Sequence, residues 1–223
     1  QCEKWSGIRI VIAASFAPIH ERNNINLGQL MGDHSMLERL QGGESIDLDE
    51  FTRKYDPVTQ LILENGGIFP FAKKLAVGNV LLPEINKKPH PMTIAEKIIS
   101  KKLISTDSSQ GFVKPGDAVL ASVDGGYSHE FTTAQVHEFL KSEYGKEYNI
   151  PNPPKFAVFE DHLLYATGVP RFGKFKEKIQ TLRDMQNDFQ KHTGVRDYSA
   201  IDGVSPGICH QVAREEFIDV GDF

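Results

Sequence analysis

The sequence predicts an α/β protein whose second half contains a mainly parallel sheet. Residues 118–123 and 156–159 are short apolar runs typical of buried strands, and residues 197–201 are expected to form a third strand. Helical patterns separate these segments. Because the order strand, helix, strand, helix, strand favours parallel strands joined by right-handed crossovers, we expect a single sheet here.

Two helices of the second half follow from local patterns. Thr132 or Thr133 is expected to cap a helix in which the apolar residues Val136, Phe139 and Leu140 share one face. Apolar residues then recur every three or four positions over residues 172–189, which indicates a long amphipathic helix.

The first half is expected to contain one strand and several helices. Residues 7–14 are apolar and β-branched, which predicts a buried strand. Pro18 is well placed in the first turn of a helix running to about residue 26, with Gly28 as its stop. The further expected elements are a short strand or turn at residues 48–51 and helices at residues 57–63 and 68–75.

A proline-rich stretch separates the two halves. Residues 78–91 contain three prolines and lack periodicity, and proline biases the residue before it away from helix. We therefore assign domains to residues 1–80 and 92–223, with residues 81–91 as the linker. The second domain would open with a helix capped by Thr93 and Glu96.

Composition excludes several classes of protein. The 223 residues are 39% hydrophobic and 25% charged, as in globular proteins. A net charge of -5 argues against a general nucleic-acid binder, and no apolar run approaches the roughly 20 residues that span a bilayer. Two cysteines form no disulfide framework, which suits a reducing compartment such as the cytoplasm, or the mitochondrial matrix in a eukaryote.

The two cysteines, Cys2 and Cys209, also cannot build a metal centre unaided, since zinc and iron–sulfur sites need three or four ligands. We therefore expect no metal site formed by this chain alone. The chain begins with glutamine rather than methionine, and we expect it to be an internal piece of a longer protein.

Candidate catalytic side chains follow each strand of the second half. In a parallel sheet the segments after the strands gather at one edge, here residues 124–135, 160–167 and 202–211. A carboxylate beside an imidazole can orient it and raise its pKa, which suits proton transfer near neutral pH. The candidates are His129, Gln135, Asp161, His162, His210 and Gln211.

Each candidate also has a plainer interpretation. Gln135 would simply face solvent, and His210 would be a core histidine. Asp161, His162 and His210 could form a metal trio, although no His-x-His or Cys-x-x-Cys spacing supports one. The sequence contains no Gly-x-Ser-x-Gly elbow and no glycine-rich phosphate-binding loop.

Four motifs of the second half resemble the aconitase superfamily. Met92-Thr-Ile-Ala-Glu-Lys97 is similar to the opening of the large subunit of 3-isopropylmalate dehydratases, and Phe159-Glu-Asp-His-Leu163 resembles the superfamily's Asp-His motif. His129-Glu-Phe-Thr-Thr-Ala-Gln135 resembles the segment with the substrate-binding glutamine. Gly207-Ile-Cys-His-Gln-Val212 resembles the segment upstream of an Asp-Ser-His motif.

The first half resembles a different part of the same superfamily. The segment from Gly7 to Asn23 is similar to the mobile swivel domain, which is the small subunit in isopropylmalate dehydratases. In aconitase this domain follows the catalytic core, whereas here it would precede it. The resemblance implies the C-terminal part of a swivel domain at residues 1–80, followed by the N-terminal part of an aconitase-like catalytic domain at residues 92–223.

The resemblance implies an iron–sulfur-dependent hydro-lyase of amino-acid biosynthesis. Such enzymes dehydrate and rehydrate 2-hydroxy di- or tricarboxylic acids such as 3-isopropylmalate, citrate or homocitrate, with a [4Fe-4S] cluster as Lewis acid. By position, Asp161 and His162 would assist departure of the hydroxyl, His210 would hydrogen-bond the iron-bound water or hydroxyl, and Gln135 would bind substrate.

The resemblance also implies that parts of the enzyme lie elsewhere. The cluster cysteines would come after Phe223, and the serine base and arginine of the swivel domain would come before Gly7. The partners would be the substrate and the remainder of the catalytic core. We therefore expect this chain alone to bind no cluster and to be inactive.

Two other functions stay open at this point. One is a non-catalytic relative acting as an RNA-binding or regulatory protein, although the acidic charge balance gives no support to RNA binding. The other is a non-catalytic assembly subunit, for which changes at Asp161 or His162 would leave turnover unchanged.

Overall fold

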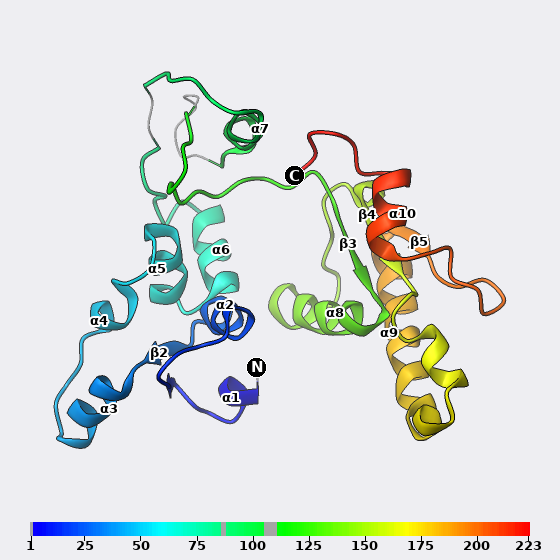
Figure 1. Cartoon of the computed structure of the whole chain (residues 1–223), viewed down its shortest axis with the longest axis horizontal. Helices are drawn as coiled ribbons and strands as arrows, with labels where there is room; N and C mark the ends of the chain where they lie inside the picture. Colours follow the sequence, from blue (N-terminus) through cyan, green and yellow to red (C-terminus); the bar gives the residue numbers. More distant parts are fainter. Residues whose placement is uncertain (1, 86–87, 105–110) are drawn as a thin grey trace. The chain divides into compact units, whose positions relative to one another are not determined.

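The computed structural model describes residues 2–85, 88–104 and 111–223 (Figure 1). These residues form two compact units, Gln1–Ala121 and Ser122–Phe223, which are described separately below. The boundary between the two compact units follows Ala121, whereas the linker was expected at residues 81–91. The helix after Thr93 therefore belongs to the first unit. The assignment of a swivel-like and a catalytic domain remains a prediction.

The first unit contains a two-stranded parallel sheet. Strands β1 (Ile10–Ile12) and β2 (Leu30–Gly32) are joined by helix α2 (Pro18–Leu27), which confirms a strand and a helix expected here. Gly28 ends α2 in the left-handed conformation with φ of 69°. A Cβ at Gly28 would lie 2.1 Å from the carbonyl carbon of Gly66, so only glycine fits where these two turns meet.

Helices pack beside this small sheet. The predicted helices appear as α5 (Pro57–Glu64), α6 (Ile68–Ala76) and α7 (Ile94–Lys102), and Thr93 and Glu96 form the expected capping box of α7. A short helix, α1 (Cys2–Trp5), precedes β1. The buried core of the unit comprises Ile25, Met31, Val58, Ile62, Leu63, Phe71 and Val80.

The expectation of a strand or turn at residues 48–51 was wrong, because Leu48–Thr52 forms helix α4. Asp49 and Glu50 lie in its first turn, where acidic side chains favour a helix, and Phe51 and Thr52 are buried. Strand β2 and helix α3 (His34–Gln41) were not predicted from the sequence. The side chain of Asp33 caps α3 by accepting the N–H of Met36 at 3.1 Å.

The second unit contains the parallel sheet expected from the strand–helix alternation. Strands β3 (Gly126–His129), β4 (Phe156–Phe159) and β5 (Arg196–Tyr198) are adjacent in that order, and both pairs are parallel. Three α-helices of the unit are α8 (Glu130–Tyr144), α9 (Lys176–Thr193) and α10 (Cys209–Glu216). The short 3-10 turns are η1 (Pro153–Lys155), η2 (Leu164–Gly168) and η3 (Pro170–Phe175).

Helices cover both faces of this sheet. Ala157 and Phe159 of β4 pack on Cys209 and Ala213 of α10. Val158, whose side chain points to the opposite face, packs with Phe189 of α9 and other residues. Strand β4 is therefore buried on both faces, and Val158 and Phe159 are completely inaccessible to solvent. Figure 1 shows α10 and α9 flanking the three strands.

Four predicted boundaries in the second half were wrong, and the first two concern a strand and the helix that follows it. Residues 118–123 form only an isolated bridge through Ala121, and Ala118 and Leu120 instead pack against the core of the first unit. The strand is β3, whose sequence Gly-Tyr-Ser-His is too polar for an apolar-run criterion. Helix α8 accordingly begins at Glu130, with His129 as its cap instead of Thr132 or Thr133.

The remaining two elements are shifted. The long helix begins at Lys176, because residues 170–175, which include Pro170 and Gly173, form the 3-10 turn η3. The third strand covers residues 196–198 and ends before residue 201. In the part of the chain that the structure describes, no helix has the length and apolar character needed to cross a membrane.

Candidate functional site

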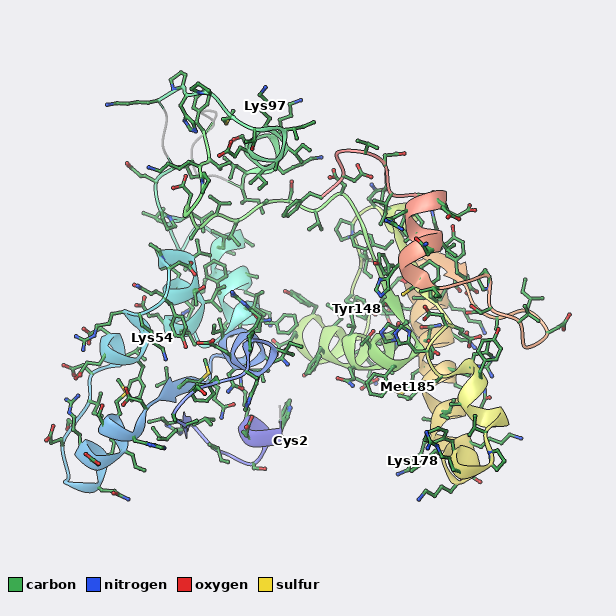
Figure 2. All side chains as sticks on the ribbon, viewed as in Figure 1. Cys2, Lys54, Lys97, Tyr148, Lys178 and Met185 are labelled. Carbon is green, nitrogen blue, oxygen red and sulfur yellow. The ribbon has the colours of Figure 1, made fainter. Side chains whose placement is uncertain are left out.

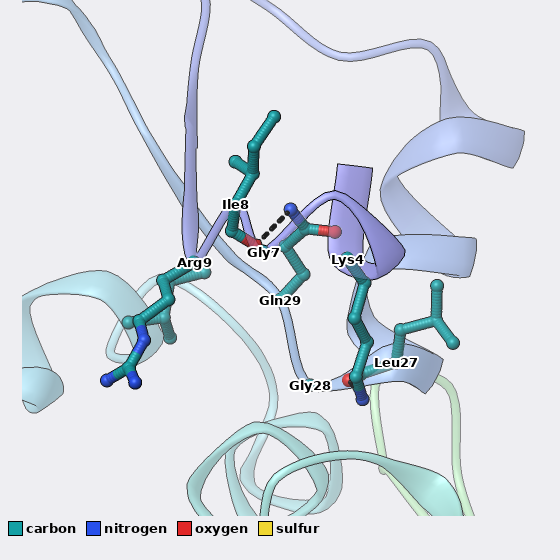
Figure 3. Close-up of a pocket in the computed structure, with 8 residues that line it drawn as sticks. Lys4, Gly7, Ile8, Arg9, Leu27, Gly28 and Gln29 are labelled. Atoms are coloured by element: carbon teal, nitrogen blue, oxygen red, sulfur yellow. Dashed lines mark hydrogen bonds between the residues drawn. The ribbon is translucent and has the colours of Figure 1, made fainter. Parts of the chain in front are cut away.

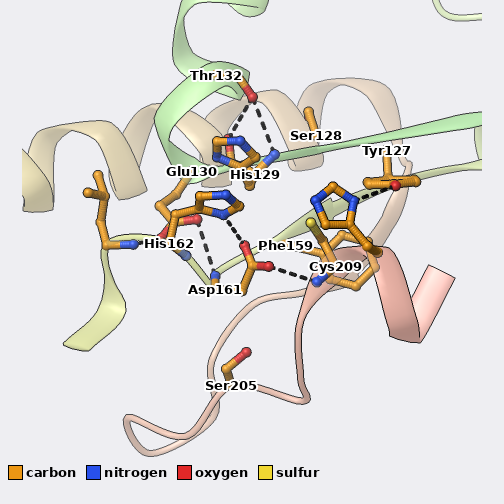
Figure 4. Close-up of polar contacts among 12 residues, drawn as sticks. Tyr127, Ser128, His129, Glu130, Thr132, Phe159, Asp161, His162, Ser205 and Cys209 are labelled. Atoms are coloured by element: carbon orange, nitrogen blue, oxygen red, sulfur yellow. Dashed lines mark hydrogen bonds and ion pairs between the residues drawn. The ribbon is translucent and has the colours of Figure 1, made fainter. Parts of the chain in front are cut away.

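The candidate site lies at the carboxyl ends of β3 and β4, beside the start of α10 (Figure 4). His129 is the last residue of β3, and Glu130 is the first of α8. Asp161 and His162 follow the end of β4. The expected gathering of segments from three parts of the chain is therefore present at this edge, and hydrogen bonds join them.

Asp161 and His162 form a direct hydrogen-bonded pair. Oδ1 of Asp161 lies 2.6 Å from Nδ1 of His162, and Oδ2 of Asp161 accepts the backbone N–H of Cys209 at 2.7 Å. The Asp161 side chain is 4% exposed, whereas that of His162 is 43% exposed. The acid is thus held inside the protein, and the imidazole is open to molecules from outside.

The environment of Asp161 favours its charged form. Burial raises the pKa of this carboxyl, but the hydrogen bonds from the Cys209 N–H and from His162 outweigh burial, and the net pKa is lowered. An ionised carboxylate only accepts hydrogen bonds, so neutral His162 must donate from Nδ1. The Nε2 lone pair of His162 is then free to accept a proton.

Glu130 holds the backbone that carries this pair. Its side chain is fully buried, and its two oxygens accept the N–H groups of Asp161 at 3.2 Å, His162 at 2.9 Å and Leu163 (Figure 4). Glu130 was not among the residues predicted for this site. The only feature of the sequence that marks Glu130 is its place as an acidic residue in the first turn of a helix directly after a strand. Such a residue by itself indicates only a favourable helix start.

His129 stacks on His162. The ring centroids are 3.6 Å apart, and the planes are inclined by 14°. Burial lowers the pKa of His129, and the charge of His162 lowers it further. Nδ1 of His129 is buried and has no hydrogen-bond partner among the described residues. At neutral pH His129 therefore presents an uncharged face to the candidate proton-transfer group.

His210 lies near the pair and is hydrogen-bonded to a residue of β3. The residue is exposed, and its Nδ1 is 2.8 Å from the hydroxyl of Tyr127 on β3. In the described part of the chain, no hydrogen bond joins His210 to Asp161 or His162 directly. The connection runs instead through Cys209, whose N–H binds Asp161. The neighbouring Gln211 accepts a hydrogen bond from Arg214.

Gln135 is not brought into this hydrogen-bonded group. It lies on the exposed side of α8, whereas Glu130, Thr133 and Ala134 of the same helix are buried. Among the described residues, no hydrogen bond connects Gln135 with Asp161, His162 or His210. The proposed substrate contact of Gln135 therefore remains a prediction.

Glu160 serves the fold instead of the site. Its side chain is 2% exposed and accepts two hydrogen bonds from Arg183 of α9, at 2.7 and 3.1 Å. It also accepts the backbone N–H of Ala200 at 2.7 Å. The acid at the end of β4 thus ties together α9 and the segment after β5.

A second group of polar side chains is also structural. His137 is 1% exposed, and its two ring nitrogens lie 2.7 Å from the Tyr148 hydroxyl and 2.9 Å from Asp188. His192 contacts the carbonyl oxygen of Tyr148 at 2.8 Å. These partners join α8 to α9, as expected for histidines placed outside the site.

Potential metal ligands approach one another at the site in two sets. These are His129, Glu130 and His162, and Asp161, His162 and Cys209. In the first set, the Glu130 carboxylate already accepts three N–H groups. The rings of His129 and His162 are stacked, so their nitrogen lone pairs lie in nearly parallel planes and do not converge on one ion. The trio of Asp161, His162 and His210 is not among the sets found in the described residues.

The two cysteines are far from equivalent. Cys2 is exposed on α1 of the first unit (Figure 2), whereas Cys209 is fully buried in the second. Burial raises the pKa of the Cys209 thiol to about 11, with a further contribution from neighbouring Asp161. With no metal bound, Cys209 is therefore a protonated thiol at neutral pH.

One cavity of the first unit has a volume of about 370 Å³ (Figure 3). It lies between the segment before β1 and the turn after α2. Its lining includes Lys4, Arg9 and Gln29, and the Gln29 amide donates to the carbonyl oxygen of Ile8 at 3.1 Å. The residues that line this cavity belong to the first unit, whereas the predicted site residues all belong to the second.

Comparisons with known proteins give a consistent result for part of the chain. No family model matches. A segment of 131 residues is 32% identical to 3-isopropylmalate dehydratase large subunit 1 of Thermotoga maritima. This segment covers 58% of this chain and 26% of that protein. A probable large subunit from Methanosarcina mazei is 30% identical over 129 residues, 56% of this chain and 26% of its own.

A third relative extends the same likeness. The probable 3-isopropylmalate dehydratase large subunit of Methanothermobacter thermautotrophicus is 28% identical over 125 residues, which cover 56% of this chain and 26% of that protein. The chain thus spans about a quarter of the length of each of these three relatives.

Proposed function

The chain belongs to the aconitase and isopropylmalate dehydratase superfamily, and on that premise we propose that it supplies the proton-transfer group of a hydro-lyase. The reaction would dehydrate and rehydrate a 2-hydroxy di- or tricarboxylic acid. Of the candidate substrates, 3-isopropylmalate is favoured because the relatives are named as its dehydratases.

The observation that carries this proposal is the Asp161–His162 pair. Hydroxide is a poor leaving group, so its departure needs a proton from a positioned acid. His162, 43% exposed and held at 2.6 Å by buried Asp161, would deliver that proton from Nε2. In the reverse direction, the neutral ring would remove a proton from the water that adds. Asp161 would orient the ring and stabilise its cationic form.

His210 and Gln135 have supporting roles in the proposal. His210, held beside β3 by Tyr127, would hydrogen-bond the departing hydroxyl or the incoming water. Gln135 would donate hydrogen bonds to a substrate carboxylate from its exposed position on α8. Residues 1–80 would be part of a swivel-like, small-subunit domain, as their resemblance implies.

The iron–sulfur cluster of the family does not fit the donors in this chain. A [4Fe-4S] centre with one open iron needs three thiolates, and the chain has two cysteines. Cys2 is exposed in one unit, and Cys209 is a buried thiol in the other. Proton transfer by His162 is therefore the contribution that this chain would make. Without the cluster, the chain alone would lack activity.

The test is an activity panel on the protein as its source organism makes it, purified without oxygen. Each 2-hydroxy acid would be offered to the wild type, to His162→Gln and to the control His34→Gln. His34 is an exposed histidine of α3 in the other unit. Loss of a general acid–base group lowers turnover by about 10²–10⁴-fold.

We expect that loss for His162→Gln and none for His34→Gln. Equal turnover in all three proteins would contradict the proposal and would favour a non-catalytic assembly subunit. A wild type inactive on every acid of the panel would remove the hydro-lyase assignment altogether.

A further inference from the structure

We propose that Glu130 is the positioning residue of this site: its buried carboxylate fixes the turn 161–163 and thereby aims the His162 imidazole. This inference rests on the proposed function for its catalytic consequence, but its structural part can be tested independently. Glu130 lies in a different segment from the pair it would control, at the start of α8.

The hydrogen bonds of Glu130 are unusual for a buried acid. Oε1 accepts the N–H groups of His162 and Leu163, and Oε2 accepts that of Asp161. In the part of the chain that is described, Glu130 forms no ion pair with a lysine or arginine. A buried carboxylate is expensive unless its charge is compensated, and here backbone N–H groups provide the compensation.

The same contacts give acceptors to three backbone N–H groups that have no other acceptor in the described part of the chain. Residues 161–163 lie between β4 and η2, outside any helix or strand. Buried N–H groups without acceptors would cost free energy, so the turn depends on Glu130 for its conformation. The conformation of residues 161–163 then determines where the side chains of Asp161 and His162 point.

Two further contacts complete the restraint of the imidazole. Asp161 holds the ring edge at Nδ1, and His129 covers one ring face at a centroid distance of 3.6 Å. His129 and Glu130 are consecutive residues, so the junction of β3 and α8 supplies both the anchor of the turn and the stacking partner. Among the described residues, no hydrogen bond is made to Nε2 of His162, so this nitrogen is the one that faces a substrate in the proposed function.

Glu130→Gln is the sharpest variant, because it keeps the shape and replaces one oxygen by an NH₂ group. In either orientation of the amide, that NH₂ would face at least one backbone N–H that now has an acceptor. The matched control is Glu138→Gln on the same helix, since Glu138 is exposed and pairs only loosely with Lys141, at 3.7 Å.

Three measurements would be made on the full chain and on the active protein. Amide hydrogen exchange would report on residues 161–163, and ¹⁵N NMR would report on the nitrogens of His162. Steady-state kinetics would give kcat and KM separately. We expect Glu130→Gln to speed exchange of these amides at least about tenfold and to lower kcat about 10–100-fold with KM little changed. Glu138→Gln should match the wild type in all three.

The outcomes separate this inference from the proposed function. If Glu130→Gln leaves exchange, the His162 signals and kcat unchanged, the positioning role is overturned. If the turn loosens in a protein inactive on every hydroxy acid, the positioning role stands and the function fails. Should the variant not fold, wild-type exchange decides: these amides must be protected although they lie outside regular structure, and unprotected rates would overturn the inference.

Discussion

At the scale of single residues, the site depends on one buried carboxylate and the groups that keep it charged. Asp161 accepts from the Cys209 N–H at 2.7 Å and pairs with His162 at 2.6 Å. The closeness of Asp161 and His162 could be predicted, because the two residues are adjacent in sequence and directly follow a buried strand. The contact with Cys209 could not, since it joins residues far apart in the chain.

Asp161→Asn should destabilise the protein in a pH-dependent way. The folded-state pKa of Asp161 is lowered, so its stabilising effect is complete above the unfolded-state pKa of about 3.9 and disappears as the pH falls through the lower folded value. Denaturant unfolding near pH 7 should show a loss of about 1–2 kcal/mol, typical of a hydrogen-bonded charge. A loss that persists undiminished at about pH 2 would contradict this assignment.

The two thiols should differ sharply in reactivity. Cys209 is completely buried, and burial raises its pKa to about 11, whereas Cys2 is exposed. A thiol reagent at neutral pH should modify one cysteine rapidly and the second only after unfolding. Peptide mapping should identify Cys2 as the fast site. Rapid modification of both cysteines in the folded protein would show that α10 does not pack as described.

At the scale of elements, periodicity and caps predicted the helices well, whereas the strands were harder. Helix α7 was found from Thr93 and Glu96, and β4 from its apolar run. Strand β3 was missed because Tyr127, Ser128 and His129 are polar or amphipathic residues. Tyr127 hydrogen-bonds His210, Ser128 hydrogen-bonds Thr133, and His129 stacks on His162, so the polar contacts of these residues weakened the strand signal. Local pattern also could not show which acids would be buried by distant partners.

Arg183→Met should destabilise the second unit substantially. Glu160 is 2% exposed and would lose its only described cationic partner, leaving a buried charge with the Ala200 N–H as its remaining described hydrogen-bond donor. Because Arg183 is itself 28% exposed, we expect about 2–3 kcal/mol, below the roughly 3–5 kcal/mol of a fully buried pair.

Arg171→Met serves as a control for Arg183→Met, since Arg171 lies in η3, where its guanidinium lies over the ring of Phe172 and forms no ion pair among the described residues. Denaturant titration would compare the two variants with the wild type. The combined change Glu160→Gln and Arg183→Met should recover part of the loss. Equal midpoints for the wild type and Arg183→Met would remove the structural role assigned to Glu160.

At the scale of the whole molecule, the α/β class and the parallel sheet followed from the order of elements. The superfamily followed from short motifs, and the relatives support it over 58% of the chain at most. The compact units and the Glu130 anchor needed three-dimensional contacts, because each joins segments that no local pattern connects.

The isolated chain should fail to assemble a [4Fe-4S] cluster. A cluster with one open iron needs three thiolates, whereas this chain has two cysteines, and one of them is a buried thiol. Anaerobic incubation with iron and sulfide, followed by gel filtration, should give a colourless protein without hydro-lyase activity. Stoichiometric retention of a brown cluster would show that other residues of this chain act as ligands.

The central claim is that Asp161 fixes the His162 ring and leaves Nε2 free for proton transfer. The most direct test is ¹⁵N NMR of the His162 ring in the full chain, above the pH at which the ring becomes neutral. The geometry predicts a proton on Nδ1, bound to Asp161 Oδ1, and a bare Nε2. In Asp161→Asn this preference should weaken. A wild-type ring with its proton on Nε2, or with both tautomers equally populated, would contradict the claim.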